Sequence, residues 1–281
     1  MNEHLHYRLQ WQSGAVYPGA HPGQMVGGGQ LFKRHVPFIA SPDPRRIDLR
    51  ASVLDPFNGF SVRVYQQQSS IKLYLVADLS ASMRFCGESS KQQSLVQLLL
   101  DMAYSACNYG DSFGFIGCTD RVKPCWYMPA GQSLERVKAL AADISQAYFS
   151  GNAHGLIHAT PYLPGHRALV FLLSDFHFPL SQLRELLSSL QNHDVVPIVL
   201  WDSYECDNWP DWGLVSVQDL ESGKDRTLFM RPALRKKIRV AYAQRQMALK
   251  ECFRAFGCEP LFMTAAYNAA LINRYFQQRV A

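Results

Sequence analysis

The feature that most constrains the fold is a series of short apolar runs, separated by stretches of helical periodicity, that begins at residue 71. The clearest runs lie at 72–77, 112–118, 168–174 and 195–200. Runs of this length that are apolar throughout are typical of strands buried on both faces, and helices between them connect parallel neighbours. The pattern predicts an α/β protein with a doubly wound, mostly parallel sheet and helices on both faces.

The segments around these runs complete the pattern. We expect helices at about 90–109, 132–147, 154–162, 181–192, 232–256 and 265–278, and further strands at 61–67, 123–128, 214–217, 226–230 and 260–263. The leucines of the helix at 181–192 fall on one face, which predicts that this face packs on the core. Pro232 suits the first turn of the long helix and Gly257 suits its end.

Residues 1–70 have a different composition, rich in glycine, proline and arginine. Tyr17-Pro18-Gly19, Gly27-Gly28-Gly29 and Pro42-Asp43-Pro44 interrupt any long regular element. We therefore expect two parts: an N-terminal segment of loops and short strands over 1–70, and an α/β domain with a C-terminal elaboration over 71–281. No linker precedes the C-terminal tail, so the tail is assigned to the same domain.

With 281 residues, of which 48% are hydrophobic, the chain is long and apolar enough to bury a full core. Residues 1–11 lack the apolar segment of a secretory signal, and apolar runs such as 168–173 are far shorter than the about 18 residues needed to cross a bilayer. We expect a cytoplasmic protein without a membrane span. Seven cysteines without a Cys-x-x-Cys pair argue against a disulfide framework or a zinc knuckle, and we expect most of them in the core.

The net charge of +5 is only mildly basic and does not require a nucleic-acid partner. Basic residues cluster at 45–50 and 235–239, but neither cluster is interleaved with aromatic residues, so we do not expect nucleic-acid binding. An acidic partner stays open for both clusters. Around Asp48 we expect the arginines mainly to hold the N-terminal segment in place through ion pairs and backbone hydrogen bonds.

The residues that carry chemistry follow the strand expected at 72–77. Asp78, Ser80 and Ser82 form an Asp-x-Ser-x-Ser loop at the end of this strand, where ligands bind in a doubly wound sheet. A carboxylate and two hydroxyls present hard oxygens to one point, and Mg²⁺ requires about six oxygens at roughly 2.0–2.1 Å. The alternative interpretation is that the loop only caps a helix N-terminus. We favour a divalent-cation site, with Mg²⁺ as the expected ion and Mn²⁺ or Ca²⁺ as other candidates.

Two further segments belong to this hypothesis. Asp175 follows the strand at 168–174, so its carboxylate is expected at the same edge of the sheet. The loop before the helix at 154–162 offers either the amide oxygen of Asn152 or the hydroxyl of Ser150. The predicted metal residues are therefore Asp78, Ser80, Ser82, Asn152 and Asp175.

These residues resemble the metal-ion-dependent adhesion site of von Willebrand factor A domains, which combines an Asp-x-Ser-x-Ser loop with a later Thr and a later Asp. The loop maps to Asp78, Ser80 and Ser82, and the later Asp maps to Asp175. Asn152 stands near the Thr position, which is a departure from the family pattern. An amide oxygen can bind a hard cation, and weaker or water-mediated binding is the alternative.

The stretch from Pro42 to Ser52, followed by Val62 and Arg63 ahead of the Asp78 loop, resembles the bacterial DUF58 family of such domains. Members are usually encoded beside a MoxR-class AAA+ ATPase. The resemblance implies a role as adaptor or co-chaperone of that ATPase in assembling other protein complexes, often metalloenzymes.

The expected function is therefore a non-enzymatic binding module whose cation captures an Asp or Glu of a partner protein. One alternative is a metal-dependent hydrolase. No general base or nucleophile can be identified for it, and Ser80 stands where related phosphotransferases have a second carboxylate. Another alternative is a degenerate adhesion site that binds its partner without metal. His154 and His158 have a zinc-like spacing, but Gly155 occupies the position of the catalytic glutamate, so surface contacts are expected instead.

Overall fold

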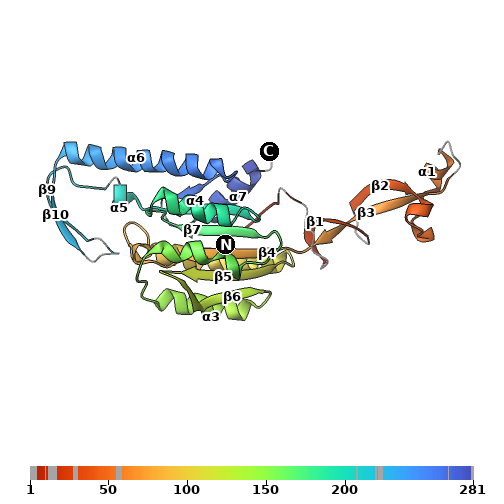
Figure 1. Cartoon of the computed structure of the whole chain (residues 1–281), viewed down its shortest axis with the longest axis horizontal. Helices are drawn as coiled ribbons and strands as arrows, with labels where there is room; N and C mark the ends of the chain where they lie inside the picture. Colours follow the sequence, from red (N-terminus) through yellow and green to blue (C-terminus); the bar gives the residue numbers. More distant parts are fainter. Residues whose placement is uncertain are drawn as a thin grey trace. The chain divides into compact units, whose positions relative to one another are not determined.

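The computed structural model describes residues 5–9, 11, 18–27, 31–54, 59–206, 208–218, 220, 224–264 and 266–279. The chain divides into two compact units (Figure 1). The first, called the α/β unit here, comprises residues 1–8, 72–108 and 112–281. The second, called the N-terminal unit, comprises residues 9–71 and 109–111.

The α/β unit contains a six-stranded sheet in the order β11-β8-β7-β4-β5-β6. Its strands are β4 (Lys72–Asp78), β5 (Ser112–Cys118), β6 (Val122–Gly131), β7 (Leu169–Ser174), β8 (Asp194–Leu200) and β11 (Leu261–Met263). All neighbours pair in parallel except β5 and β6, which are antiparallel. The link between those two strands, 119–121, is too short for a crossover, so the chain can only turn back. The predicted mixed α/β fold with a mostly parallel sheet is confirmed.

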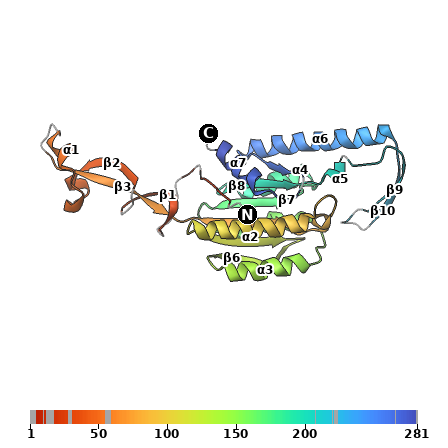
Figure 2. The same cartoon turned by 180° about the vertical axis from the view of Figure 1, so that it is seen from behind.

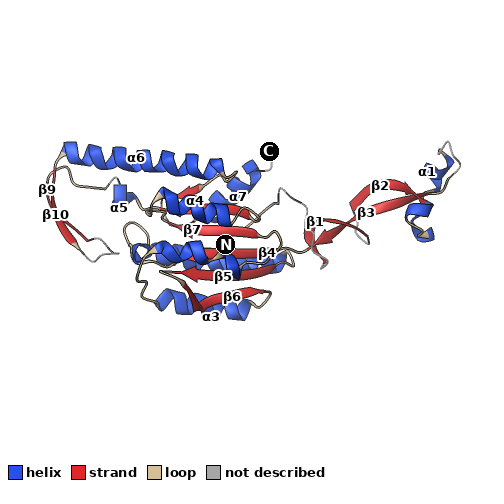
Figure 3. Cartoon of the chain, in the orientation of Figure 1, coloured by secondary structure: helices blue, strands red, loops and turns tan. Residues whose placement is uncertain are grey.

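Helices surround this sheet (Figure 3). They are α2 (Lys91–Asn108), α3 (Leu134–Gln146), α4 (Leu180–Ser189), α5 (Ser203–Cys206), α6 (Pro232–Ala255) and α7 (Ala269–Arg279), with 3₁₀ turns η3 (Ala81–Arg84), η4 (Ala153–His158) and η5 (Thr160–Tyr162). The single helix expected at 154–162 is wrong, because the segment forms two 3₁₀ turns, the second of which begins at Thr160 and contains Pro161. The last helix starts later than expected, where Asn268 accepts a hydrogen bond from the backbone of Ala270 at 2.9 Å.

Helices cover both faces of the sheet. Seen from opposite sides, α4 lies in front of the sheet in Figure 1 and α2 lies in front of it in Figure 2. Along β4, Tyr74 and Val76 belong to the core that contains the leucines of α4. The alternate side chain, Leu75, points to the opposite face. On that face Phe171 of β7 contacts Phe276 of α7, with ring centroids 5.8 Å apart.

A hairpin and a long helix follow the last central strand. Strands β9 (Gly213–Gln218) and β10 (Asp225–Met230) pair antiparallel, and they cover the strands predicted at 214–217 and 226–230. Helix α6 begins at Pro232 and ends just before Gly257, whose φ of 73° is readily adopted by glycine. The chain then returns to the sheet as β11.

Six of the seven cysteines have described side chains, and these six are free thiols. Cys118, Cys252 and Cys258 are buried, whereas Cys86, Cys107 and Cys125 are exposed. The expectation that most cysteines lie in the core is therefore wrong for half of those described.

The N-terminal unit is a three-stranded antiparallel sheet in the order β1-β3-β2, with a short helical end. Its elements are β1 (Pro18–Gly27), β2 (Leu31–Pro37), η1 (Phe38–Ala40), η2 (Pro44–Arg46), α1 (Leu49–Val53) and β3 (Ser61–Ser69). β1 has 10 residues and β3 has 9, and β3 covers the strand predicted at 61–67. Register shifts between β1 and β3 let the pairing continue through a segment rich in proline and glycine.

Asp48 holds the helical end of this unit together. It is buried, and its carboxylate accepts a hydrogen bond from Arg63 Nε at 2.7 Å and lies 3.0 Å from His35 Nε2. It also caps α1 by accepting from the backbone of Arg50 and Ala51. The side-chain bonds of Arg63 and His35 hold the pKa of Asp48 far below its ordinary value. The structural role expected here is confirmed for Asp48 and for Arg46, which pairs with Asp43, whereas Arg45 and Arg50 form no ion pair among the described residues.

We expect the lowered pKa of Asp48 to make this unit sensitive to acid. Because its pKa is depressed in the folded state, it contributes stability above the unfolded pKa of about 3.9, and that stability is lost as the pH falls further. We expect hydrogen exchange over residues 31–54 and 59–69, corrected for the intrinsic rate, to accelerate below about pH 4. The Asp48→Asn variant should exchange faster already at neutral pH and show less acid dependence. An unchanged acid profile in this variant would contradict the assignment.

Candidate functional site

The site is built around Asp78, the last residue of the central strand β4. Its side chain is completely buried. One carboxylate oxygen accepts a hydrogen bond from the backbone of Ser80 at 2.8 Å, and the other accepts from the hydroxyl of Ser174 at 2.6 Å. Ser174 ends the neighbouring parallel strand β7, so both strands deliver polar side chains to the same edge of the sheet.

The two serines of the loop lie next to each other. The hydroxyl oxygens of Ser80 and Ser82 are 3.1 Å apart. Neighbouring ligands of an octahedral Mg²⁺ with bonds of roughly 2.0–2.1 Å are separated by about 3 Å, so this spacing suits two adjacent ligands of one ion. The backbone of Ala81 donates to the carbonyl of Gly151 at 3.0 Å, which brings the loop containing Asn152 to the Asp78 loop.

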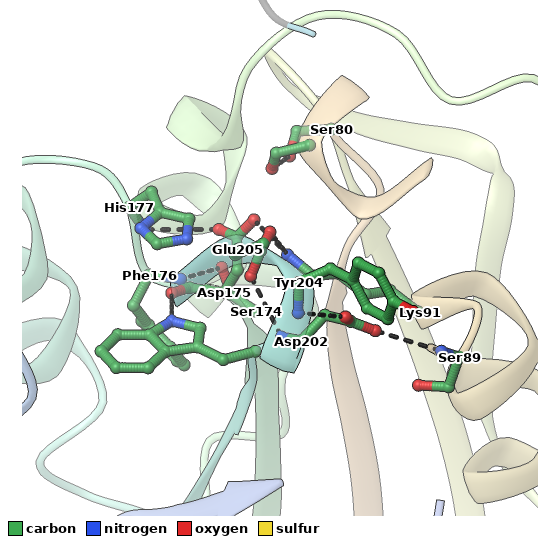
Figure 4. A network of polar contacts seen from close by, with 12 residues as sticks. Ser80, Ser89, Lys91, Ser174, Asp175, Phe176, His177, Asp202, Tyr204 and Glu205 are labelled. Atoms are coloured by element: carbon green, nitrogen blue, oxygen red, sulfur yellow. Dashed lines mark hydrogen bonds and ion pairs between the residues drawn. The ribbon is translucent and has the colours of Figure 1, made fainter. Parts of the chain in front are cut away.

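Asp175 lies in a polar network beneath this loop (Figure 4). It is 2% exposed, and Ser82 forms a side-chain hydrogen bond with it. Its carboxylate accepts from the backbone of His177 at 3.3 Å and from the ammonium group of Lys91 at 3.2 Å. Its backbone carbonyl accepts from the indole of Trp201 at 2.8 Å. The structure thus brings Asp78, Ser80, Ser82 and Asp175 to one edge of the sheet.

Lys91 is a buried cation within the site. Its side chain is 3% exposed, and its ammonium group also donates to Glu205 of α5 at 2.7 Å. Burial alone would lower the pKa of Lys91, but the charges of Asp175 and Glu205 raise it above its ordinary value. The sequence analysis missed this residue. A lysine one turn before Leu95, on the buried face of α2, was the available signal.

The two aspartates have opposite pKa shifts. Burial, and then the charge of Asp175, raise the pKa of Asp78 to about 7, although hydrogen bonds from Ser174 and Ser80 oppose this. Burial also disfavours the charged form of Asp175, but the charges of Lys91 and His177 and the hydrogen bonds outweigh it and lower the pKa. Asp175 therefore carries a negative charge, and a cation nearby would favour the ionised form of Asp78 as well.

Asn152 is near the loop but its side chain already has a partner. Its amide oxygen accepts from the backbone of His154 at 2.9 Å and caps η4, and its backbone donates to Asp120 at 2.8 Å. Gly151 has a φ of 81°, and a Cβ there would lie 2.6 Å from a carboxylate oxygen of Asp120, so the turn requires glycine. Ser150, the alternative hydroxyl, is exposed.

A cavity of about 640 Å³ opens above the loop. Its lining includes Ser82, Asn152, His177, Glu205 and, from the hairpin, Val217. No cluster of three or more His, Cys, Asp or Glu side chains suited to a metal occurs among the described residues. The predicted cation site contains only two aspartates, Asp78 and Asp175, and its other ligands would be serine hydroxyls. The absence of such a cluster among the described residues therefore does not test it.

Helix α6 supports the loop that carries Asp175. Phe176 has a φ of 52°, a left-handed conformation that is strained for an aromatic residue. Its backbone N–H donates to Ser174 at 3.0 Å, and the guanidinium of Arg245 donates to the carbonyls of Phe176 and Phe178. These bonds hold the strained turn in place.

Asp202 connects the end of β8 to the loop before α2. It is buried and accepts from the backbone of Glu88, Ser89 and Tyr204 at 2.8–3.2 Å. A Cβ on Gly87 would lie 2.3 Å from its carboxylate, so this close approach also requires glycine. Through these bonds the residues around Glu205 are fixed beside the start of α2.

A mostly parallel sheet with a polar site at the ends of two adjacent strands defines this chain as an α/β protein with a strand-end site. The chain belongs to the DUF58 family: the family model, described as "Protein of unknown function DUF58", matches residues 43–248. The resemblance to the DUF58 family that the sequence shows is therefore confirmed.

Two relatives extend the comparison. An "Uncharacterized protein in moxR 3'region" from Paracoccus denitrificans is 32% identical over 99 residues, which cover 35% of this chain and 94% of that protein. An uncharacterized protein from Mycobacterium tuberculosis is 24% identical over 249 residues, which cover 86% of this chain and 77% of that protein.

Solved structures with weak similarity include an aerotolerance-related membrane protein from Bacteroides fragilis, at 12% identity and a TM-score of 0.44, covering 75% of this chain and 98% of that one. The conserved hypothetical protein BatB from Bacteroides thetaiotaomicron matches at 10% identity and a TM-score of 0.44, covering 75% and 97%. In the described part of this chain, no helix is long and apolar enough to cross a membrane.

The buried Lys91 generates a stability prediction. We expect Lys91→Met to destabilise the α/β unit by about 3–5 kcal/mol, because it leaves Asp175 and Glu205 buried without their shared cation. Adding Glu205→Gln should restore part of the loss. Lys138→Met is a matched control, since Lys138 forms an exposed ion pair with Glu135 at 2.8 Å, and an exposed pair contributes little to stability. Urea unfolding followed by circular dichroism measures all three, and equal stability of the two single variants would refute the assigned role.

Proposed function

We propose that this protein is a non-enzymatic, divalent-cation-dependent protein-binding module of the von Willebrand factor A type. The single observation that carries the proposal is the meeting of one carboxylate and two hydroxyls, from Asp78, Ser80 and Ser82, at the end of β4, with Asp175 close by. The donor set consists of hard oxygens only, which suits Mg²⁺ better than a soft metal.

In this proposal each residue of the site has its own role in holding the cation. Ser80 and Ser82 would hold the ion directly, Asp78 and Asp175 directly or through water, and Asn152 lies at the rim of the same cavity. When bound, the ion would supply a Lewis-acidic position for a carboxylate of a partner. The cavity of about 640 Å³ leaves room for such a side chain above the loop.

The proposal also includes a partner protein and a cellular location. A relative in the same comparison is named for its position in the moxR 3' region. On this basis we assign the chain a role as adaptor or co-chaperone of a MoxR-class AAA+ ATPase in the cytoplasm, acting in the assembly or maturation of protein complexes, metalloenzymes among them. The partner's contribution to the site would be an Asp or Glu side chain.

One observation favours a second candidate, in which the same surface binds without metal. Lys91 already places a positive charge 3.2 Å from Asp175. If this ammonium group supplies the charge balance of the site, the loop acts through its shape and hydrogen bonds alone. The two candidates differ in whether a divalent cation binds.

The first experiment is calorimetric titration of the chelator-treated protein with Mg²⁺ and with Mn²⁺. We expect saturable binding with one ion per chain, lost in Ser80→Ala and Ser82→Ala and strongly weakened in Asp78→Asn. The asparagine keeps the volume of the buried aspartate, and circular dichroism checks that each variant is folded. Ser188→Ala on α4 is the matched control. A folded wild-type protein that binds neither ion would refute the metal proposal and favour the metal-free candidate.

A substitution of Asn152 is expected to strengthen cation binding, unlike the variants above. Threonine can also cap a helix, and its hydroxyl matches the adhesion-site pattern that Asn152 departs from. We expect Asn152→Thr to bind Mg²⁺ more tightly than the wild type in the same titration. Asn152→Ala, which removes the side-chain oxygen, is the comparison variant. Equal affinity of all three proteins would exclude this position from the site.

A further inference from the structure

The helical end of the N-terminal unit exposes an unusual amount of apolar side chain. Ile39 is 94% exposed, Val53 84%, Leu54 82% and Leu49 69%. Helix α1 and turn η1 lie at the same end of the β2–β3 pair, since β2 runs directly into η1 and Phe38 N–H donates to the carbonyl of Phe60 at 2.8 Å (Figure 1). We call the exposed residues Ile39, Arg45, Leu49, Arg50, Val53 and Leu54 the arm tip.

The outward orientation of α1 is built into the fold. Its inner side is held by Ser52, whose hydroxyl donates to the carbonyl of Asp48 at 2.7 Å and accepts from the backbone of Ser61 at 2.9 Å. Residues four apart share a helix face, so Leu49 and Val53 point away together from this anchored side. The apolar face is therefore presented by a fixed element.

The same end of the unit is cationic. The described residues 31–54 and 59–69 contain six Lys and Arg residues and two Asp residues. Both aspartates are engaged, Asp43 with Arg46 and Asp48 with Arg63. Arg45 and Arg50 are exposed and have no ion-pair partner within the part of the chain that the structure describes. Apolar side chains beside unpaired arginines predict a partner that is apolar inside and anionic at its surface.

An anionic lipid surface fits this description better than a protein groove. The most exposed residues are aliphatic, whereas binding hot spots between proteins favour Trp, Tyr and Arg and are poor in Leu and Val. Exposure of 82–94% for three of these side chains shows that they stand free of their own unit, as residues that insert between lipid headgroups do. Arginines next to them match the phosphates of anionic lipids.

We propose that the arm tip is a peripheral membrane-binding site, which inserts Ile39, Leu49, Val53 and Leu54 below the headgroups of an anionic bilayer while Arg45 and Arg50 bind the lipid phosphates. The site is separate from the strand-end site and does not need its cation. The protein would thus bind a membrane surface without spanning it.

The test is cosedimentation of the full chain with vesicles of phosphatidylcholine alone and with vesicles of equal parts phosphatidylcholine and phosphatidylglycerol. We expect binding only to the second kind, weakened by salt. Ile39→Asp with Val53→Asp should abolish it, and each of Arg45→Gln and Arg50→Gln should weaken it about fivefold. The matched control is Leu214→Asp in β9, where the leucine is 74% exposed but lies outside the N-terminal unit.

Several results would overturn the proposal. They are absence of binding to either vesicle, equal binding to both, or binding that the arm-tip variants leave unchanged. Self-association of the wild type that disappears in Ile39→Asp with Val53→Asp, without vesicle binding, would assign the surface to a second copy of the chain instead. Repeating the assay in chelator separates this proposal from the metal proposal, because vesicle binding should persist.

Discussion

The complete burial of Asp78 at the end of the central strand is the constraint on which the site depends. A carboxylate without solvent must be supplied with hydrogen bonds, and the Ser80 backbone and the Ser174 hydroxyl supply them. Each bond in turn fixes a neighbouring segment, the loop with its paired serine hydroxyls on one side and the end of β7 on the other. The polar edge of the sheet thus follows from the need to supply the buried carboxylate of Asp78 with hydrogen bonds.

Charge balance extends this constraint beyond the sheet. Asp175 is as buried as Asp78, and Lys91 of α2 and Glu205 of α5 form the buried ion pairs around it. Because a buried charge without a partner is strongly destabilising, these helices cannot shift independently of the strand ends. Arg245 adds a support from α6 by holding the strained turn at Phe176.

The N-terminal unit follows a different principle. Its small polar centre at Asp48 holds α1 in position, and the apolar side chains of α1 stay in solvent. A folded surface that leaves aliphatic residues exposed beside arginines is costly unless something covers it. The two units therefore offer surfaces of different chemistry: oxygen ligands and carboxylates in one, aliphatic and cationic groups in the other.

Local patterns in the sequence predicted the buried strands, the amphipathic helices, the Asp78 loop at a strand end and the DUF58 resemblance, because periodicity, strand termination and short motifs are local properties of the chain. The contact of Lys91 with Asp175 and Glu205, across 84 and 114 residues, is visible only in the folded chain. The same holds for the bond between the hydroxyl of Ser174 and the carboxylate of Asp78, which are 96 residues apart in the sequence. These features depend on strand order and on which groups must share a buried charge or hydrogen bond, and such long-range pairings leave no periodic trace in the sequence.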